Sequence, residues 1–189
     1  MKKAAMFGLD ARIALAIFGA LSVISGAALY SAIQESKVTA LLTEINEVGK
    51  AWEQFYLDTG SLPERMSTDT STNSYYVFKT ANLVTDNGAT GWAGPYISTS
   101  MFRNARGEDV WLIQQSTNDW NIMDNGKCTT GLSCAMYVRF WKNPRALSAS
   151  IIEALDARVD NSDGNDKGIF RWDTYAINYR YAPLSNPHD

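Results

Sequence analysis

The chain has 189 residues, enough for one ordinary domain with an appended segment and for a hydrophobic core. Hydrophobic residues make up 46% of it, with 13 Gly and 5 Pro, which excludes a disordered, collagen-like or low-complexity chain. The net charge of −3 argues against a nucleic-acid partner.

An uncharged apolar stretch of 21 residues without proline, residues 13–33, lies near the N-terminus. As an α-helix it would span about 30 Å, the thickness of the hydrocarbon core of a bilayer. Lys2, Lys3 and Arg12 precede this stretch and Glu35 follows it, so the positive-inside rule predicts a cytoplasmic N-terminus. The sequence therefore predicts a single-pass inner-membrane protein whose C-terminal domain is periplasmic or otherwise extracytoplasmic.

Helical periodicity continues beyond the apolar stretch. No proline occurs from residue 13 to residue 57, so one continuous helix is expected, with a membrane half (9–34) and an amphipathic half (35–60). Gly60 and Pro63 are expected to end it. The apolar residues of the amphipathic half recur at steps of three and four: Val38, Leu41, Leu42, Ile45, Val48, Trp52, Phe55 and Tyr56.

Two other readings of the N-terminus stay open, a cleaved secretory signal peptide and a plain single-span anchor. The unbroken helical pattern argues against the signal peptide. The composition argues against the plain anchor, because 11 of the 21 residues of the apolar stretch are Ala, Gly or Ser, whereas leucine would suffice for contact with lipid. Small residues four apart let helix backbones approach closely in a membrane, which favours helix-to-helix assembly. Three such pairs occur: Ala16 with Ala20, Ser22 with Gly26, and Ala28 with Ala32.

Four segments carry a family resemblance. The basic start MKKAAMFG, residues 1–8, resembles the leader of type IV prepilins and type II secretion pseudopilins. AWEQFYLDTGSLPE (51–64) is similar to the helix end of these proteins, and GWAGPYI (91–97) to the segment that follows it. ALDARVDNSDGNDKGIFR (154–171) is similar to an Asp-rich C-terminal segment of the group.

The resemblance implies that a prepilin peptidase cuts between Gly8 and Leu9. It also implies that assembly machinery builds a homo-oligomeric helical filament from the mature chain. Family members usually carry Glu at the fifth position after the cut, where this chain has Ile13, and its acidic residue is Asp10. Asp10 could take the place of this Glu, with Arg12 pairing to Asp10 of the next subunit. Alternatively, the missing Glu could mark a specialised subunit such as one at a filament tip. Asp10 and Arg12 could also simply flank the span, or the leader could stay uncleaved.

The rest of the chain, residues 61–189, is expected to form an α+β head. Strands are predicted at residues 110–115, 120–123, 135–141 and 175–181, the last with Tyr175, Ile177, Tyr179 and Tyr181 on one face. A short helix is predicted at residues 148–159 with Ser148 as N-cap. The fold expected is a long N-terminal helix packed on an antiparallel β-sheet.

Cys128 and Cys134 are the only cysteines. Two thiols without a histidine cannot complete a zinc shell, and export favours a disulfide over two free thiols.

An Asp-rich segment is the best metal candidate, because hard oxygen ligands crowded on a loop suit calcium. Its candidate ligands are Asp160, Asp163, Asn165 and Asp166. The EF-hand spacing does not match, and a turn without metal is the competing interpretation.

Catalytic motifs find almost no support. The only histidine, His188, is the next-to-last residue on a tail expected to be loose, and neither standard phosphate-binding glycine loop is present. No catalytic residue and no certain cofactor is assigned, and the chain is not expected to be an enzyme.

The expectation is a filament subunit that moves from the membrane to the periplasm or cell surface. The alternative is a monomeric, single-span binding or adhesion domain, whose ligand surface five head tryptophans could line (Trp92, Trp111, Trp120, Trp141 and Trp172).

Overall fold

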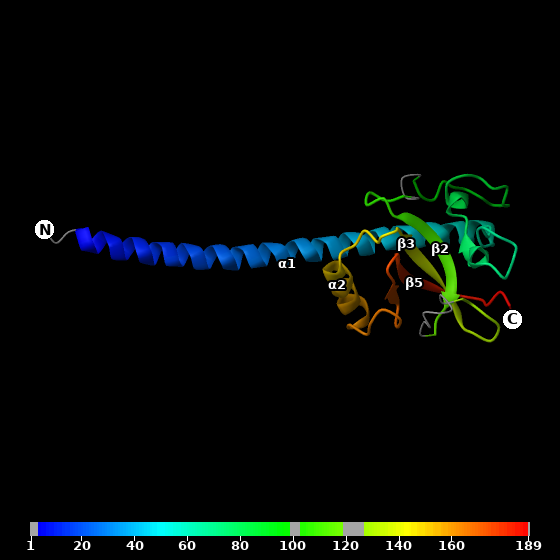
Figure 1. Cartoon of the computed structure of the whole chain (residues 1–189). Coiled ribbons are helices and arrows are strands. Elements are labelled where there is room, and N and C mark those ends of the chain that lie inside the picture. Colours follow the sequence, from blue (N-terminus) through cyan, green and yellow to red (C-terminus); the bar gives the residue numbers. More distant parts are fainter. Residues whose placement is uncertain (1–3, 99–102, 119–126, 189) are drawn as a thin grey trace. The chain divides into compact units, whose positions relative to one another are not determined.

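The computed structural model describes residues 4–98, 103–118 and 127–188 of the chain (Figure 1). The chain divides into two compact units, Met1–Thr39 and Ala40–Asp189. The second unit is the head, together with the last part of the long helix. Helix α1, Ala4–Thr59, has 56 residues and confirms the single continuous helix expected from the sequence. It ends at Gly60, whose φ of +64° favours glycine and whose N–H donates to Tyr56 O at 2.8 Å.

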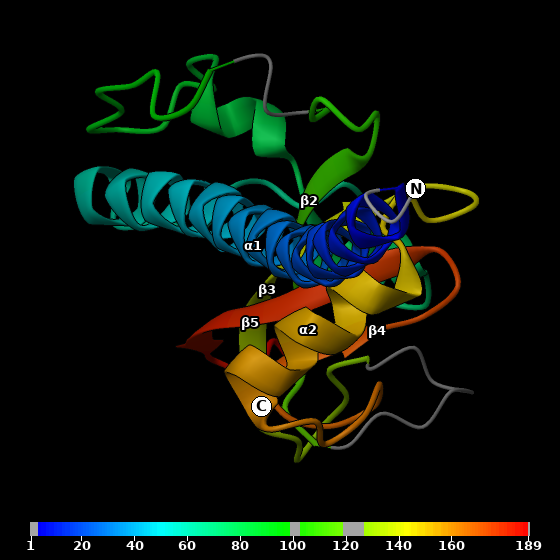
Figure 2. The same ribbon diagram turned by 90° about the vertical axis from the view of Figure 1, so that its left-hand side faces the viewer.

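A five-stranded antiparallel sheet forms the centre of the head, in the order β1-β2-β3-β5-β4. The strands are β1 Val77–Phe78, β2 Asp109–Ser116, β3 Cys134–Trp141, β4 Phe170–Trp172 and β5 Ala176–Leu184. The head part of α1 runs along the sheet, and α2, Ala149–Asp160, lies beside β4 (Figures 1 and 2). The expected α+β class is confirmed.

The main core lies between the head part of α1 and one face of the sheet. Six of the eight apolar positions of α1 at steps of three and four become buried, whereas Leu42 is half-buried and Tyr56 is 45% exposed. The buried positions face the sheet and α2, whose apolar side chains are equally buried. This core includes Leu41, Ile45, Val48, Trp52 and Phe55 of α1, Leu112, Met136, Val138, Phe140 and Ile177 of the sheet, and Ile152 and Leu155 of α2.

Helix α1 meets β5 closely at Gly49. A Cβ atom at Gly49 would lie 2.0 Å from the ring of Tyr181, so only glycine leaves room for this ring. The Tyr181 hydroxyl donates to Glu53 Oε2 at 3.2 Å, and its ring meets that of Trp52 edge to face. Burial, with the neighbouring Glu53 carboxylate, raises the pKa of Tyr181 to about 12.

Gly49→Ala is therefore expected to destabilise the head by about 1–3 kcal/mol through overpacking, although alanine is the better helix former by about 1 kcal/mol. The measurement is the midpoint of urea unfolding followed by tryptophan fluorescence. The control is the double variant Gly49→Ala/Tyr181→Ala, in which the clash is absent. If Gly49→Ala costs as much with Tyr181 removed as with Tyr181 present, the close approach is not the cause.

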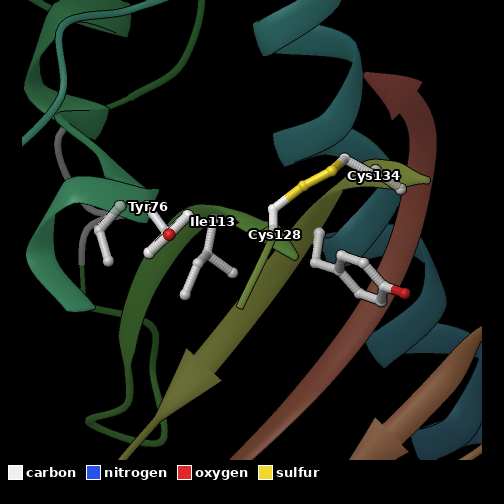
Figure 3. Packing of buried hydrophobic residues seen from close by; sticks show 7 residues of the cluster. Tyr76, Ile113, Cys128 and Cys134 are labelled. Carbon is white, nitrogen blue, oxygen red and sulfur yellow. A yellow bond between two sulfur atoms is a disulfide. The ribbon is translucent and has the colours of Figure 1, made fainter. Parts of the chain in front are cut away.

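A second cluster of buried residues contains the disulfide and includes side chains of β1, β2 and β3 (Figure 3). Cys128 and Cys134 are bonded, with their Cα atoms 5.9 Å apart and a separation of six residues along the chain. Both are buried, and Tyr137 and Ile113 lie in the same cluster. The bond joins the start of β3 to the segment that precedes it. The disulfide that the sequence analysis favours over two free thiols is therefore confirmed.

Three strand predictions lie inside the described residues, and all three are confirmed with shifted ends. Residues 110–115 and 135–141 each lie within a strand, whereas residues 120–123 lie outside the described part of the chain. The prediction for 175–181 was wrong at Tyr175, because β5 begins at Ala176 and runs to Leu184. Proline has no N–H group to donate to a neighbouring strand, so it is tolerated only where a strand has a free edge. Strand β4 pairs only with residues 177–179 of β5, which leaves such an edge at Pro183.

Two local predictions need correction. Ser148 does occupy the N-cap of α2, but its side chain makes no capping bond; its Oγ lies 3.1 Å from Ser150 Oγ instead. His188 is not on a loose tail. Its Nε2 lies 3.1 Å from the Tyr76 hydroxyl, and its backbone N–H donates to Asn186 Oδ1 at 3.0 Å.

Candidate functional site

The apolar stretch of α1, residues 13–33, is the first candidate site. Helix α1 is long and apolar enough to cross a membrane. Its most apolar segment of 18 residues has a mean hydropathy of 2.1, and none of that segment is buried within the chain. Its length and composition are compatible with a single-pass membrane anchor. Large apolar side chains are exposed on every side of the stretch, so a folded monomer gives them no partner. They are Ile13, Leu15, Ile17, Phe18, Leu21, Val23, Ile24, Leu29, Tyr30 and Ile33.

The small-residue pairs of this stretch point in three different directions. Successive residues of an α-helix are rotated by about 100°, so the two members of each pair project to nearly the same side. The pairs that begin at Ala16, Ser22 and Ala28 are themselves separated by about 120° around the helix axis. A helix that pairs with one partner needs one small-residue face, whereas this helix offers three.

The residues of the expected cleavage site lie within α1. Gly8 and Leu9 are helical, and a Cβ atom at Gly8 would meet nothing within 4 Å. Asp10 and Arg12 are exposed, and among the described side chains neither has an ion-pair or hydrogen-bond partner. Two residues apart on a helix, they project to different sides and do not face each other.

Two of the segments that carry the family resemblance contact each other in the head. The Tyr96 hydroxyl, from segment 91–97, donates to Asp58 Oδ2 at the end of α1, 3.0 Å away. The Tyr96 ring meets that of Phe55 edge to face at 5.8 Å, and Gly91 lies against the Asp58 carbonyl. Segments 51–64 and 91–97 therefore form one packed unit at the end of the helix.

The Asp-rich segment forms the second candidate site. One carboxylate oxygen from each of Asp156, Asp160 and Asp163 lies within 4.8 Å of the others. Asp156 is buried, and this burial, together with the charges of Asp163 and Asp160, raises the pKa of Asp156. Only Asp160 and Asp163 of this trio were among the candidate ligands from the sequence.

The other two candidate ligands are not part of this trio. The Asn165 side-chain amide donates to Trp172 O at 3.4 Å, and Asp166 lies outside the group of three carboxylates. Asp156 was missed because it lies inside the helix rather than in the loop. Its spacing of four from Asp160 within a predicted helix is the signal that could have found it.

The described tryptophans of the head mainly pack. Trp111 stacks on Trp141 with ring centroids 5.5 Å apart, Trp172 stacks on Phe170, and the Trp92 indole N–H donates to Asn82 O. Trp120 lies outside the described residues. Trp111 also lines a hollow of about 460 Å³ with Arg139, Asp173 and Tyr175, among other side chains. A ligand-binding domain would need a hollow of this kind.

Comparisons with known proteins add no relative to this picture. No family model, no curated protein and no solved structure matches the chain. The function therefore has to be argued from the apolar stretch, the head and the residues that carry the family resemblance.

Proposed function

We propose that the chain is a structural subunit of a type IV pilus-like filament or of a type II secretion pseudopilus, built from many copies of the chain. In this account the apolar stretch, residues 13–33, first holds the subunit in the membrane and then packs against the same stretch of neighbouring subunits. The observation that carries the proposal is the set of three small-residue pairs that project about 120° apart around the helix. A helix that is surrounded by neighbouring helices needs small residues on several sides, so that each neighbour's backbone can approach it closely.

The physical driving force is an exchange of lipid for protein contacts. Lipid tails are as apolar as leucine, so helices in a membrane associate through close backbone packing rather than through the hydrophobic effect. Pairs such as Ser22 with Gly26 permit this packing. Outside the membrane the same exposed side chains, Phe18 and Ile24 among them, would be in water unless neighbouring helices covered them. The subunit is thus suited to both environments.

The head fits the outer surface of such a filament. It has its own buried core, its own sheet and a disulfide, which are the features expected of a domain that folds on its own. The packed contact between segments 51–64 and 91–97 gives the residues that resemble pilin segments a shared structural role.

Asp10 and Arg12 are proposed to pair between subunits. They project to different sides of one helix, so each can face a different neighbour. A charge buried among apolar helices without a partner would be costly, and a neighbouring opposite charge would offset that cost.

The test is the intact mass of the membrane-extracted protein from its native host, together with the size of its assemblies. A filament subunit predicts loss of residues 1–8 and large assemblies. Gly8→Leu is expected to keep the leader and lose the assemblies, while the smaller change Gly8→Ala is the control expected to retain more processing. An intact N-terminus with a solitary monomer would identify an anchored binding domain instead, and a fragment that starts near Ala32 would identify a secretory signal peptide.

A further inference from the structure

The hollow of about 460 Å³ in the head is lined by side chains of β1, β2 and β3 and of the turn between β4 and β5. Its volume falls within the range of about 300–1,000 Å³ that is typical of small-molecule sites. Tyr76 and Ile113, two of its lining residues, belong to the buried cluster that holds the disulfide (Figure 3). The hollow therefore rests on a packed part of the head.

The pairing of β2 with β3 places an arginine of the hollow beside a tryptophan. Arg139 of β3 lies directly opposite Trp111 of β2, so the two side chains project from the same face of the sheet. The guanidinium carbon of Arg139 lies 5.8 Å from the centre of the Trp111 ring, a cation–π distance. A charged group and an aromatic ring thus lie side by side in the wall of the hollow.

The Arg139 guanidinium has no hydrogen-bond partner among the residues that the structure describes. Its Nε is fully buried without an acceptor. Its ion pair with Asp173 is long, with 3.8 Å between Arg139 Nη2 and Asp173 Oδ2, which is beyond hydrogen-bond distance. The other oxygen, Asp173 Oδ1, accepts the N–H groups of Tyr175 and Ala176 at 2.6 Å and 2.7 Å, so the turn holds this carboxylate where it lies.

Arg139 is therefore less well paired than its burial requires. Burial lowers the pKa of Arg139, although the charge of Asp173 acts in the opposite direction. A second anion beside the guanidinium would offset the cost of removing this charge from water. The Arg139 side chain is 17% exposed, so an anion in the hollow can reach it.

The charge of the hollow is opposite to that of the whole chain. Its described lining has two cations, Lys127 and Arg139, against one carboxylate, Asp173, whereas the chain has a net charge of −3. An excess of one positive charge suits a monoanion rather than a doubly charged phosphate. The planar guanidinium also matches a carboxylate, which can accept two parallel N–H groups from it.

The rim of the hollow offers apolar contact. In the described part of the head, from residue 40 onward, four large hydrophobic side chains are exposed, and two of them, Met66 and Tyr175, line the hollow. These two residues are far apart in the sequence, and the fold brings them to one place. Covering such side chains with the apolar part of a ligand is favourable.

We propose that this hollow binds a small aromatic carboxylate, with the carboxylate on Arg139 and the ring against Trp111 and Tyr175. Small-molecule sites combine apolar and aromatic walls with a few polar groups that fix the orientation of the ligand. A neutral sugar also packs on aromatic rings, but it would leave the Arg139 charge without an anionic partner. The site lies entirely in the head, so it goes beyond the proposed filament function and does not depend on it.

The experiment is calorimetric titration of the full chain in a neutral detergent with three probes. N-acetyl-L-phenylalanine has the ring and the carboxylate, its primary amide lacks the charge, and N-acetylglycine lacks the ring. The first probe is expected to bind with a dissociation constant of about 0.1–1 mM, as its size allows. The other two are expected to bind at least about tenfold more weakly, because each loses one of the two interactions.

Three variants assign the binding to the hollow. Arg139→Met is expected to weaken binding of the acid by about tenfold and to leave binding of the amide unchanged. Tyr175→Ala, at an exposed position, is expected to weaken binding of both, and it replaces Arg139→Met if that variant does not fold. Arg103→Met removes the same charge from an exposed side chain outside the hollow and should bind the acid as the unaltered chain does.

The proposal is wrong if N-acetyl-L-phenylalanine gives no heat of binding up to about 10 mM. It is also wrong if the acid and the amide bind equally, or if Arg139→Met and Arg103→Met weaken binding of the acid equally, since the Arg139 charge would then have no specific role. Binding of the disaccharide cellobiose without binding of the acid would overturn it in favour of a sugar site.

Discussion

Replacement of Ile24 by Arg is expected to abolish assembly and to weaken membrane insertion sharply. Ile24 lies near the middle of the apolar stretch and is 66% exposed, so the substitution removes no contact on which the head depends. A charged side chain at the centre of a spanning helix costs about 2.5–3.5 kcal/mol for insertion. Among packed apolar helices the same charge would have no partner, which adds a further cost.

Two readouts separate these effects. The fraction of the protein that resists alkaline extraction from membranes reports insertion, and the sedimenting fraction of high-molecular-weight material reports assembly. Ile24→Leu is the matched control and is expected to behave as the unaltered chain. The melting temperature of the head should be the same in all three proteins. Assembly of Ile24→Arg at the normal level would contradict the proposed burial of this stretch.

Arg171→Met is expected to be the most damaging single substitution in the head, at about 3–5 kcal/mol. Only 1% of Arg171 is exposed, and its guanidinium donates to four backbone carbonyls. The acceptors are Gly168 O at 3.1 Å, Ser116 O at 3.3 Å, Thr117 O at 2.8 Å and Asn118 O at 2.7 Å. Methionine would fill much of the volume but would remove the guanidinium donor from Gly168 O, Thr117 O and Asn118 O, whereas Ser116 O would keep the Tyr137 hydroxyl at 3.2 Å.

The measurement for Arg171→Met is the free energy of unfolding from urea titration of the full chain in detergent. Arg103→Met is the control, since the Arg103 side chain is 70% exposed and, among the residues that the structure describes, forms only the ion pair with Asp109 at 3.1 Å. Loss of such an exposed pair costs at most about 1 kcal/mol. Equal stability losses in the two variants would show that the carbonyl contacts of Arg171 do not hold the end of β2 to β4.

Local patterns were sufficient to predict the long helix and the longer strands. The absence of proline and the steps of three and four residues predict α1, because helix formation depends on neighbours along the chain. Strands β1 and β4 were not predicted. With two and three residues they are too short to show a period, and they exist only because Val77 meets Ile113 and Phe170 meets Tyr179 across the sheet.

The candidate sites were predictable to different degrees. The small-residue pairs follow from spacing alone, because their directions depend only on helix geometry. Two of the three residues of the carboxylate cluster were predicted, Asp160 at the end of α2 and Asp163 in the loop, whereas Asp156 lies inside the helix. The role of Arg171 could not be predicted, because its partners Ser116 to Asn118 are more than fifty residues away in the sequence.

The most direct test of the central claim is photo-crosslinking from within the apolar stretch in the native host. Phe18 is 71% exposed and aromatic, so p-benzoylphenylalanine can replace it with little change in shape. In a filament every subunit carries the probe and contacts further subunits, so one crosslink can be followed by another. Irradiation is therefore expected to give a ladder of covalent multimers of this chain. Products that stop at the monomer or the dimer, with the assembly machinery present, would contradict burial of the helix among many copies.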